Sequence, residues 1–235
     1  MTDRSDSAIA VPIVPVVHAV TDDEIVAQPG FARAAEAVMR TLGPRGAVHL
    51  RAHALCARDL FALAERLVAT QESSGCWLVV NERIDVARAV GARAAQLTRR
   101  SVLAADARRI APGLALGVSV HTARGAIAAA TFGANWVVAG HVHATPSHPG
   151  EPGRGDGLVI AAGAAGVPVI AIGGVLPAHI RALRDAGAHG VAAIRGVWGR
   201  GDAGVAERAS AAAAEYLASY DEYDGVDRRA GDGQR

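Results

Sequence analysis

Cysteine, net charge and long apolar runs are all scarce in this sequence, and each scarcity excludes a class of protein. Only two of the 235 residues are cysteines, Cys56 and Cys76, which excludes a disulfide framework and fits a reducing cytoplasm. The formal net charge is +1, so no strong field favours nucleic acid or a membrane surface as a partner. No stretch approaches the ~20 apolar residues of a membrane span, and the polar residues 1–10 lack the apolar core of a signal peptide. We therefore expect a cytoplasmic protein, with no nucleic-acid or membrane partner and with a flexible segment at residues 1–10.

The apolar residues that are present, 51% of the chain, alternate between strand and helix patterns. Over residues 168–198 an apolar run, a glycine pair, a helical pattern closed by Gly187 and a second apolar run follow one another. Eight such units can be counted, with predicted strands at residues 10–17, 47–50, 77–80, 94–97, 114–120, 136–139, 169–172 and 191–194. This alternation predicts an α/β fold, a single (β/α)8 TIM barrel over residues 11–220, whose last helix covers about residues 203–220 and is followed by a disordered tail at 221–235. An open doubly wound sheet is the alternative, although no glycine-rich dinucleotide fingerprint follows the first strand.

Glycine turns follow the last two predicted strands. Gly173 and Gly174 end the seventh strand, and Arg195 with Gly196 ends the eighth. In (β/α)8 barrels this pair of turns is a common phosphate site, because bare N–H groups can point at an anion there. The alternative is that these glycines only make tight turns.

Polar residues gather at the predicted C-terminal ends of the other strands, where barrel active sites lie. His121 directly follows the fifth strand and is placed to move a proton near neutral pH, although it could instead cap the next helix. His141 and His143 form a His-x-His pair, but the loop after them has no thiolate or paired carboxylates, so we expect no metal. The loop of residues 142–157 is rich in proline and glycine, which is typical of a lid or binding loop.

Four segments together resemble the thiamine phosphate synthase and TenI superfamily of barrels. They are NERIDVARAVGA at 81–92, GVSVHT at 117–122, GANWVVAGHV at 133–142 and PVIAIGGVLPAHIRALRDAGAHGVAAIRGV at 168–197, and the resemblance covers about residues 14–198. It implies that a thiazole phosphate is the substrate. Its phosphate would be bound by Gly173 and Gly174 and by the backbone around Ile194 and Arg195.

The resemblance divides into two branches, a transferase and an isomerase. The synthase branch holds a pyrimidine diphosphate with a Gln-x-Arg-x-Lys strand, two aspartates for Mg²⁺ and a loop lysine. In this chain only Arg51 remains of the strand motif, and Glu82, Ser101 and His148 stand at the aspartate and lysine positions. Because a diphosphate with Mg²⁺ needs hard oxygen ligands and fixed positive charge, these departures favour the TenI-like thiazole tautomerases.

In that branch the histidine matching His121 shuttles the proton, so we predict His121 as the catalytic residue. The predicted substrate-binding residues are Arg51, Asn81, Arg99, Ser119, His141, Gly173, Gly174, Ile194 and Arg195. Arg51 or Arg99 would pair with the carboxylate of the substrate. We expect no cofactor, with Mg²⁺ required only if the chain is a synthase.

Three hypotheses stay open from the sequence. The first is a thiazole tautomerase acting on a thiazole carboxylate phosphate, the second is a thiamine phosphate synthase, and the third is a non-catalytic binder of thiazole or thiamine phosphates. A homodimer is left open as well.

Overall fold

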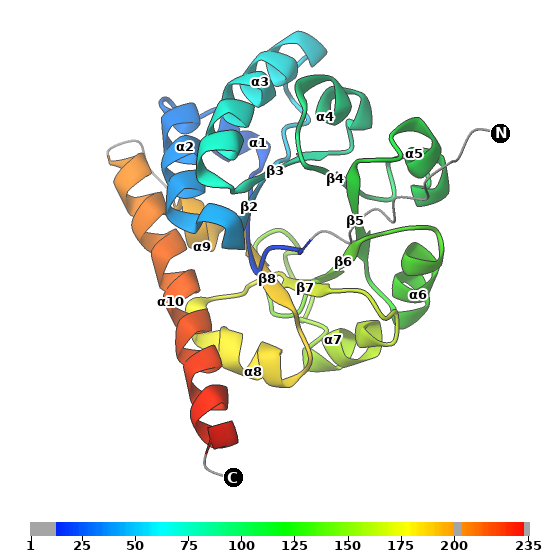
Figure 1. Cartoon of the computed structure of the whole chain (residues 1–235), viewed down its shortest axis with the longest axis vertical. Coiled ribbons are helices and arrows are strands. Elements are labelled where there is room, and N and C mark those ends of the chain that lie inside the picture. The colour runs from blue at the N-terminus through cyan, green and yellow to red at the C-terminus, as the bar shows by residue number, and fades with distance from the viewer. Residues whose placement is uncertain (1–12, 200–203, 233–235) are drawn as a thin grey trace, which may run out of the picture.

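Eight parallel strands close into one barrel surrounded by helices (Figure 1). The computed structural model describes residues 13–199 and 204–232. The strands pair in chain order, and Val17 of β1 also lies opposite Val191 of β8, which closes the sheet. The predicted (β/α)8 barrel is therefore confirmed and the open sheet is excluded. The expected flexible segment at residues 1–10 lies outside the described residues.

The strands are β1 Val17–Val20, β2 Gly46–Leu50, β3 Trp77–Asn81, β4 Ala94–Leu97, β5 Ala115–Val120, β6 Trp136–Gly140, β7 Val169–Ile172 and β8 Gly190–Ala193. The helices are α1 Asp23–Val26, α2 Phe31–Leu42, α3 Ala57–Ser74, α4 Ile84–Val90, α5 Ala104–Ile110, α6 Ala123–Thr131, α7 Asp156–Gly163, α8 Ile180–Asp185, α9 Arg195–Trp198 and α10 Val205–Asp232, with the 3-10 turns η1 Gly43–Arg45 and η2 Pro177–His179. None of the helices in the described ranges is long and apolar enough to cross a bilayer.

Residues 10–12 of the predicted first strand, 10–17, lie outside the described residues, and over residues 13–17 the prediction begins too early, because β1 is Val17–Val20. Proline explains the difference, since Pro15 has no N–H to donate to a neighbouring strand. Pairing accordingly starts at Val16, whose N–H donates to Arg45 and whose carbonyl accepts from Val191. The other seven strands lie within one residue of their predicted bounds at each end.

The C-terminal helix is longer than the sequence pattern indicates. α10 continues to Asp232 along the outer side of the barrel (Figure 1), so the tail predicted from residue 221 is helical over all its described residues. Arg45 forms ion pairs with Asp221 and with Asp224, at 3.9 Å for the second pair, and the Arg184 guanidinium lies 5.1 Å from the ring centre of Tyr223. These contacts come from distant parts of the chain, so the local composition gives no sign of them.

Two layers of apolar side chains form the core, one between sheet and helices and one inside the barrel. Inside the barrel, Trp77 and Trp136 meet edge to face with ring centres 6.2 Å apart, both at the N-terminal ends of their strands. Gly117 leaves room for this packing, since a Cβ there would lie 2.2 Å from the Trp136 ring. The two large rings therefore form part of the apolar core at the N-terminal end of the barrel interior.

Candidate functional site

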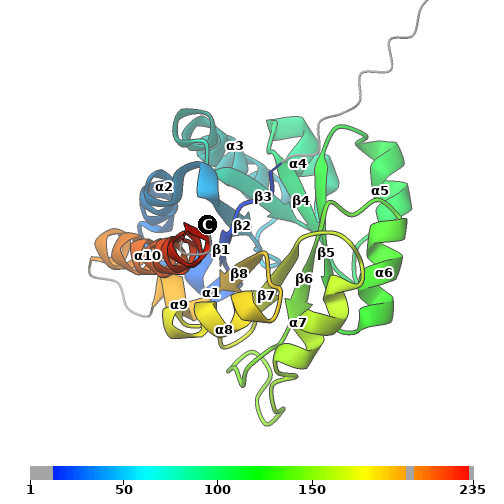
Figure 2. The same ribbon diagram turned by 60° about the horizontal axis from the view of Figure 1, so that its bottom comes forward.

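All the predicted site residues lie at or directly after the C-terminal ends of the strands. Because the eight strands are parallel and closed into a ring (Figure 2), these positions share one rim of the barrel. In chain order, the residues are Arg51 after β2, Asn81 in β3, Arg99 after β4, Ser119 and His121 at the end of β5, His141 after β6, Gly173 and Gly174 after β7, and Ile194 and Arg195 after β8.

His121 is exposed and its ring is fixed by one backbone contact. The Nδ1 atom lies 2.7 Å from the carbonyl oxygen of Gly140. A carbonyl only accepts hydrogen bonds, so Nδ1 carries the proton and Nε2 of the neutral ring is left with a free lone pair. The helix-capping role that the sequence left open belongs to the next residue, because the Thr122 hydroxyl accepts from the Gly125 N–H at 3.1 Å. In this tautomer Nε2 of His121 is an acceptor, and the N-cap of α6 is Thr122.

The histidines after β6 hold the following loop. His141 is buried, donates from Nε2 to the Pro152 carbonyl at 3.1 Å, and stacks on His148 with ring centres 4.3 Å apart. His143 packs against His179 of η2 with ring centres 4.3 Å apart. The pKa of His143 is lowered, mainly by burial and secondly by the nearby His179. The Nε2 atom of His141 is therefore already hydrogen-bonded to the loop carbonyl of Pro152. A direct contact between His141 and the substrate stays a prediction.

The two glycines after β7 are required by a close backbone approach. Both have positive φ, 104° for Gly173 and 63° for Gly174. A Cβ on Gly173 would lie 2.3 Å from the Cβ of His141, and one on Gly174 would lie 2.4 Å from the Ala144 carbonyl oxygen. Both positions therefore require glycine for the turn itself, and phosphate binding by their N–H groups stays a prediction.

The turn after β8 is fixed by α10. A Cβ on Gly196 would lie 2.2 Å from the hydroxyl of Tyr216, which donates to the Val175 carbonyl at 2.7 Å. Ile194 directly precedes α9. The Arg195 guanidinium nitrogen Nη2 lies 3.9 Å from the carboxylate oxygen Oδ2 of Asp22. The last helix thus positions both turns of the predicted phosphate site.

Neutral polar side chains line the barrel interior below the rim. His18 Nδ1 lies 2.8 Å from His49 Nε2, and His18 Nε2 lies 2.9 Å from the Pro15 carbonyl oxygen. Since that carbonyl must accept, His18 Nε2 carries the proton, His49 Nε2 donates to His18 Nδ1, and His49 Nδ1 is left as an acceptor. Burial lowers the pKa of His18 to about 4 and that of His49 well below its usual value.

Two predicted binding residues belong to the same interior layer. Ser119 accepts from the Gln96 side-chain amide at 3.1 Å. The Oδ1 atom of Asn81 and the Oε1 atom of Gln96 are buried, with no hydrogen-bond partner among the described residues. Unpaired buried acceptors are costly, so this layer suits a ligand or water that donates hydrogen bonds.

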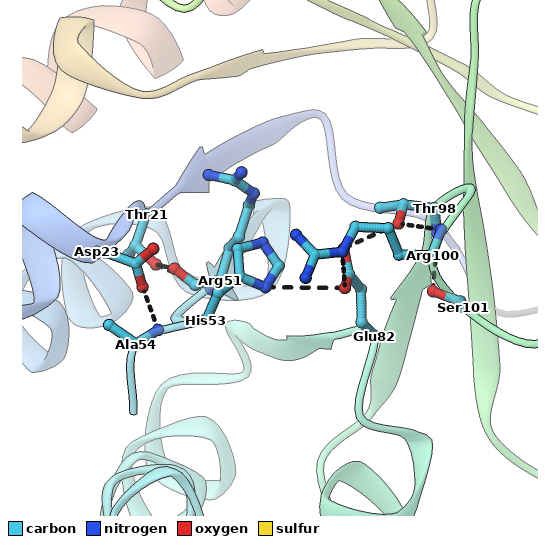
Figure 3. A network of polar contacts seen from close by, with 9 residues as sticks. All are labelled: Thr21, Asp23, Arg51, His53, Ala54, Glu82, Thr98, Arg100 and Ser101. Atoms are coloured by element: carbon cyan, nitrogen blue, oxygen red, sulfur yellow. Dashed lines mark hydrogen bonds and ion pairs between the residues drawn. The ribbon is translucent and has the colours of Figure 1, made fainter. Parts of the chain in front are cut away.

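Glu82 lies at the centre of a network on the β2 to β4 side of the rim (Figure 3). Its Oε1 accepts from the Thr98 hydroxyl at 2.8 Å, and its Oε2 lies 3.7 Å from His53 Nδ1 and 3.9 Å from Arg100 Nε. Ser101, at the position of the second aspartate in the synthase pattern, accepts from the Thr98 N–H at 2.9 Å. Arg51 stands beside the network, with its backbone N–H bound to the Thr21 hydroxyl.

These residues do not fit a Mg²⁺ ion. Mg²⁺ prefers six hard oxygen ligands, usually including carboxylates. The single carboxylate is already in contact with a hydroxyl, a guanidinium and an imidazole, and within the described ranges no three His, Cys, Asp or Glu side chains are grouped as a metal site. The residues around Glu82 therefore lack the ligand set that Mg²⁺ prefers.

A hollow lies at the N-terminal end of the barrel, opposite the predicted site residues. Its volume is about 620 Å³, and its walls include Trp77, Arg93, Arg108 and Leu114. The Arg108 guanidinium there donates to the carbonyls of Pro112, Leu114 and Gly133 and to the side chain of Asn135. Because its donors are used by the fold, Arg108 is a structural residue.

A model of the family described as thiamine monophosphate synthase matches residues 17–197. The chain belongs to this family. It is 35% identical over 217 residues to a thiamine-phosphate synthase of Roseiflexus castenholzii, covering 89% of this chain and 94% of that protein. It is also 35% identical over 198 residues to a thiamine-phosphate synthase of Methanoculleus marisnigri, covering 82% and 92%. A solved thiamine phosphate pyrophosphorylase of Pyrococcus furiosus is similar with a TM-score of 0.76 and 25% identity, over 88% of this chain and 96% of that one.

Within this thiamine monophosphate synthase family fold, the predicted binding set omitted three residues that the rim brings together. Glu82 is contacted by Thr98, Arg100 and His53. The predicted Arg99 precedes Arg100 in the same loop, and both arginines are exposed. The sequence Thr98-Arg99-Arg100-Ser101 shows two adjacent arginines, but nothing in it indicates which of them pairs with Glu82.

Proposed function

We propose that the chain is an enzyme of thiamine biosynthesis that binds a thiazole phosphate at the rim of the barrel. The phosphate would lie at the turns after β7 and β8, and the ring would lie toward the polar interior of Asn81, Gln96 and Ser119. The family membership and the placement of all these positions on one rim support this proposal.

The reaction that the comparisons favour is the transferase reaction, in which a pyrimidine diphosphate and the thiazole phosphate are joined and diphosphate is released. The observation that carries it is the near end-to-end similarity to proteins called thiamine-phosphate synthases, with 94% of one relative covered at 35% identity. This finding favours the alternative over the tautomerase that the sequence motifs placed first. Arg51 and Asn81, both at the rim, are the residues of this chain that would face the pyrimidine diphosphate.

Thiazole tautomerisation is the second candidate, and a specific observation favours it. His121 has its Nδ1 proton directed at the Gly140 carbonyl, which leaves Nε2 free to accept a proton from a substrate carbon and to return it elsewhere on the ring. Such a reaction needs neither a second substrate nor a metal. It therefore agrees with the poor fit of Glu82 and Ser101 to Mg²⁺.

Product analysis separates the two reactions. The protein would be incubated with the thiazole phosphate and hydroxymethylpyrimidine diphosphate, and separately with the thiazole carboxylate phosphate tautomer, each with Mg²⁺ and with a chelator. Formation of thiamine phosphate, followed by mass spectrometry, is the expected result. If only the tautomer is converted, the second candidate replaces the first, and binding without any product reduces the chain to a binder.

His121→Gln tests the role of the imidazole in either case. Glutamine can still donate to the Gly140 carbonyl but cannot act as a base near neutral pH. We expect the tautomerisation rate, if it is present, to fall by about 10²- to 10⁴-fold, while thiamine phosphate formation falls much less. An unchanged tautomerisation rate would reject His121 as the proton carrier.

A further inference from the structure

The environment of Glu82 is unusual for a carboxylate at a rim that binds anions. Its side chain is 15% exposed, and one oxygen is already bound to the Thr98 hydroxyl. The backbone of Glu82 has φ 65°, in the left-handed region that non-glycine residues disfavour, and its N–H donates to the Gln96 carbonyl at 2.9 Å. The fold therefore holds this carboxylate in one place against a local preference.

The second oxygen of Glu82 faces two cationic or protonatable groups. His53 Nδ1 lies 3.7 Å away and Arg100 Nε lies 3.9 Å away, and the Arg100 side chain is 73% exposed. Exposed ion pairs of this length contribute little to folding. In Figure 3 the Arg100 guanidinium extends from the β4 loop across Glu82 toward His53 and Arg51.

A divalent cation at Glu82 would have to displace these groups or lie against them. Ser101 offers a neutral hydroxyl that already accepts from Thr98, so a second anionic ligand is lacking at that position. The sequence also contains no lysine, so arginine is the side chain that can supply a fixed positive charge at the rim. Guanidinium groups suit oxyanions because they present planar, paired N–H donors.

We propose that Arg100, which is paired with Glu82 at the rim in the free protein, binds an oxyanion of the substrate directly and takes the place of a metal ion. Glu82 does not touch the ligand, and its carboxylate competes with the oxyanion for the Arg100 guanidinium. Arg51 on the β2 side supplies the second cation, and the ligand class is a phosphate or diphosphate group. This inference deepens the proposed function but concerns binding, so it does not depend on which reaction follows.

The test is a calorimetric titration of the whole chain with inorganic pyrophosphate, once in EDTA and once in excess Mg²⁺. We expect binding in EDTA at least as tight as in Mg²⁺, because Mg²⁺ competes with the arginines for the diphosphate. Arg100→Ala should weaken binding about tenfold or more, the usual effect of removing one charged hydrogen-bond donor. Arg109→Ala is the matched control, since Arg109 is also an exposed arginine paired with a carboxylate, Asp106, and it should change affinity less than twofold.

Glu82→Gln distinguishes two roles of Glu82, pairing with Arg100 and binding a metal ion, because the two roles predict opposite changes in pyrophosphate affinity. The glutamine carbonyl keeps an acceptor for Thr98 but removes the charge that competes for Arg100, so pyrophosphate binding in EDTA should be retained or become tighter. Binding seen only with Mg²⁺ and lost in Glu82→Gln would overturn the proposal in favour of a metal site. Wild-type affinity in Arg100→Ala would overturn it as well. Failure of the enzymatic assays, with these binding results intact, would reject only the proposed function.

Discussion

The buried histidine pair predicts a specific loss of stability on mild acidification. Burial holds the pKa of His18 at about 4, against 6.5 in the unfolded chain. Between these values the unfolded chain binds a proton on His18 and the folded chain does not, so stability that is fully present above about pH 7 is lost as the pH falls toward 4. The groups that act on His18 are His49, the Pro15 carbonyl and His189, and none of these is a carboxyl group.

The magnitude follows from the two pKa values. At pH 5 the His18 term alone lowers the free energy of unfolding by about 2 kcal/mol relative to pH 7.5, and it reaches about 3 kcal/mol near pH 4. His49, whose pKa burial also lowers, adds to the loss in the same direction. Carboxylates such as Asp85, whose pKa is lowered by Arg83, lose their contribution only below about pH 4.

Urea denaturation at half-unit steps from pH 7.5 to 5 measures this slope. The double variant His18→Gln with His49→Gln should be less stable overall yet much flatter with pH, because neither position can then be protonated. His121→Gln, which changes an exposed ring, should keep the wild-type slope. A flat profile for the wild type, or an undiminished slope in the double variant, would refute the assignment of a neutral buried pair.

Two further predictions concern the turns that shape the rim. Gly173→Ala should lower the free energy of unfolding by about 2–5 kcal/mol, combining the left-handed backbone with the 2.3 Å approach to His141. Gly163→Ala, at a helical position with no atom within 4 Å, should be neutral or slightly stabilising in the same urea titration, and equal losses at the two sites would contradict the packing argument. Tyr216→Phe should cost about 1–2 kcal/mol, since it leaves the Val175 carbonyl without its donor, and a variant as stable as the wild type would show that this bond does not fix the turn.

Much of the fold could be predicted because burial in a barrel follows a local repeat. An apolar run of four or five residues such as Val169–Ile172 is a strand covered on both faces, and a glycine or proline marks where it ends. The same repeat places His121, Asn81 and Arg51 at strand ends, which became one rim once the strands closed. The limits of the first strand and of the last helix differ from the prediction because they depend on Pro15 and on partners such as Arg45, which lies far from Asp221 in the chain.

The contacts inside the site could not be read in this way. Arg99 and Arg100 are neighbours of the same type and both are exposed, yet it is Arg100 whose Nε lies 3.9 Å from the Glu82 carboxylate, because the conformation of the loop after β4 sets the direction of each side chain. The tautomer of His121 depends on Gly140, and that of His49 depends on Pro15 through His18. Each of these pairs joins different strands or loops.

The eight strand and helix units, the end of the barrel at which polar groups collect and the glycines after β7 and β8 can all be read from the amino-acid sequence. Those features depend on residues a few positions apart, so local periodicity and turn chemistry are sufficient to fix them. The pairing of Glu82 with Arg100 and His53, the free Nε2 of His121 and the contact of α10 with the turn at Gly196 became evident in the folded chain alone. Closure of the sheet sets the register between strands, and it is this register that brings side chains distant in the chain within bonding distance.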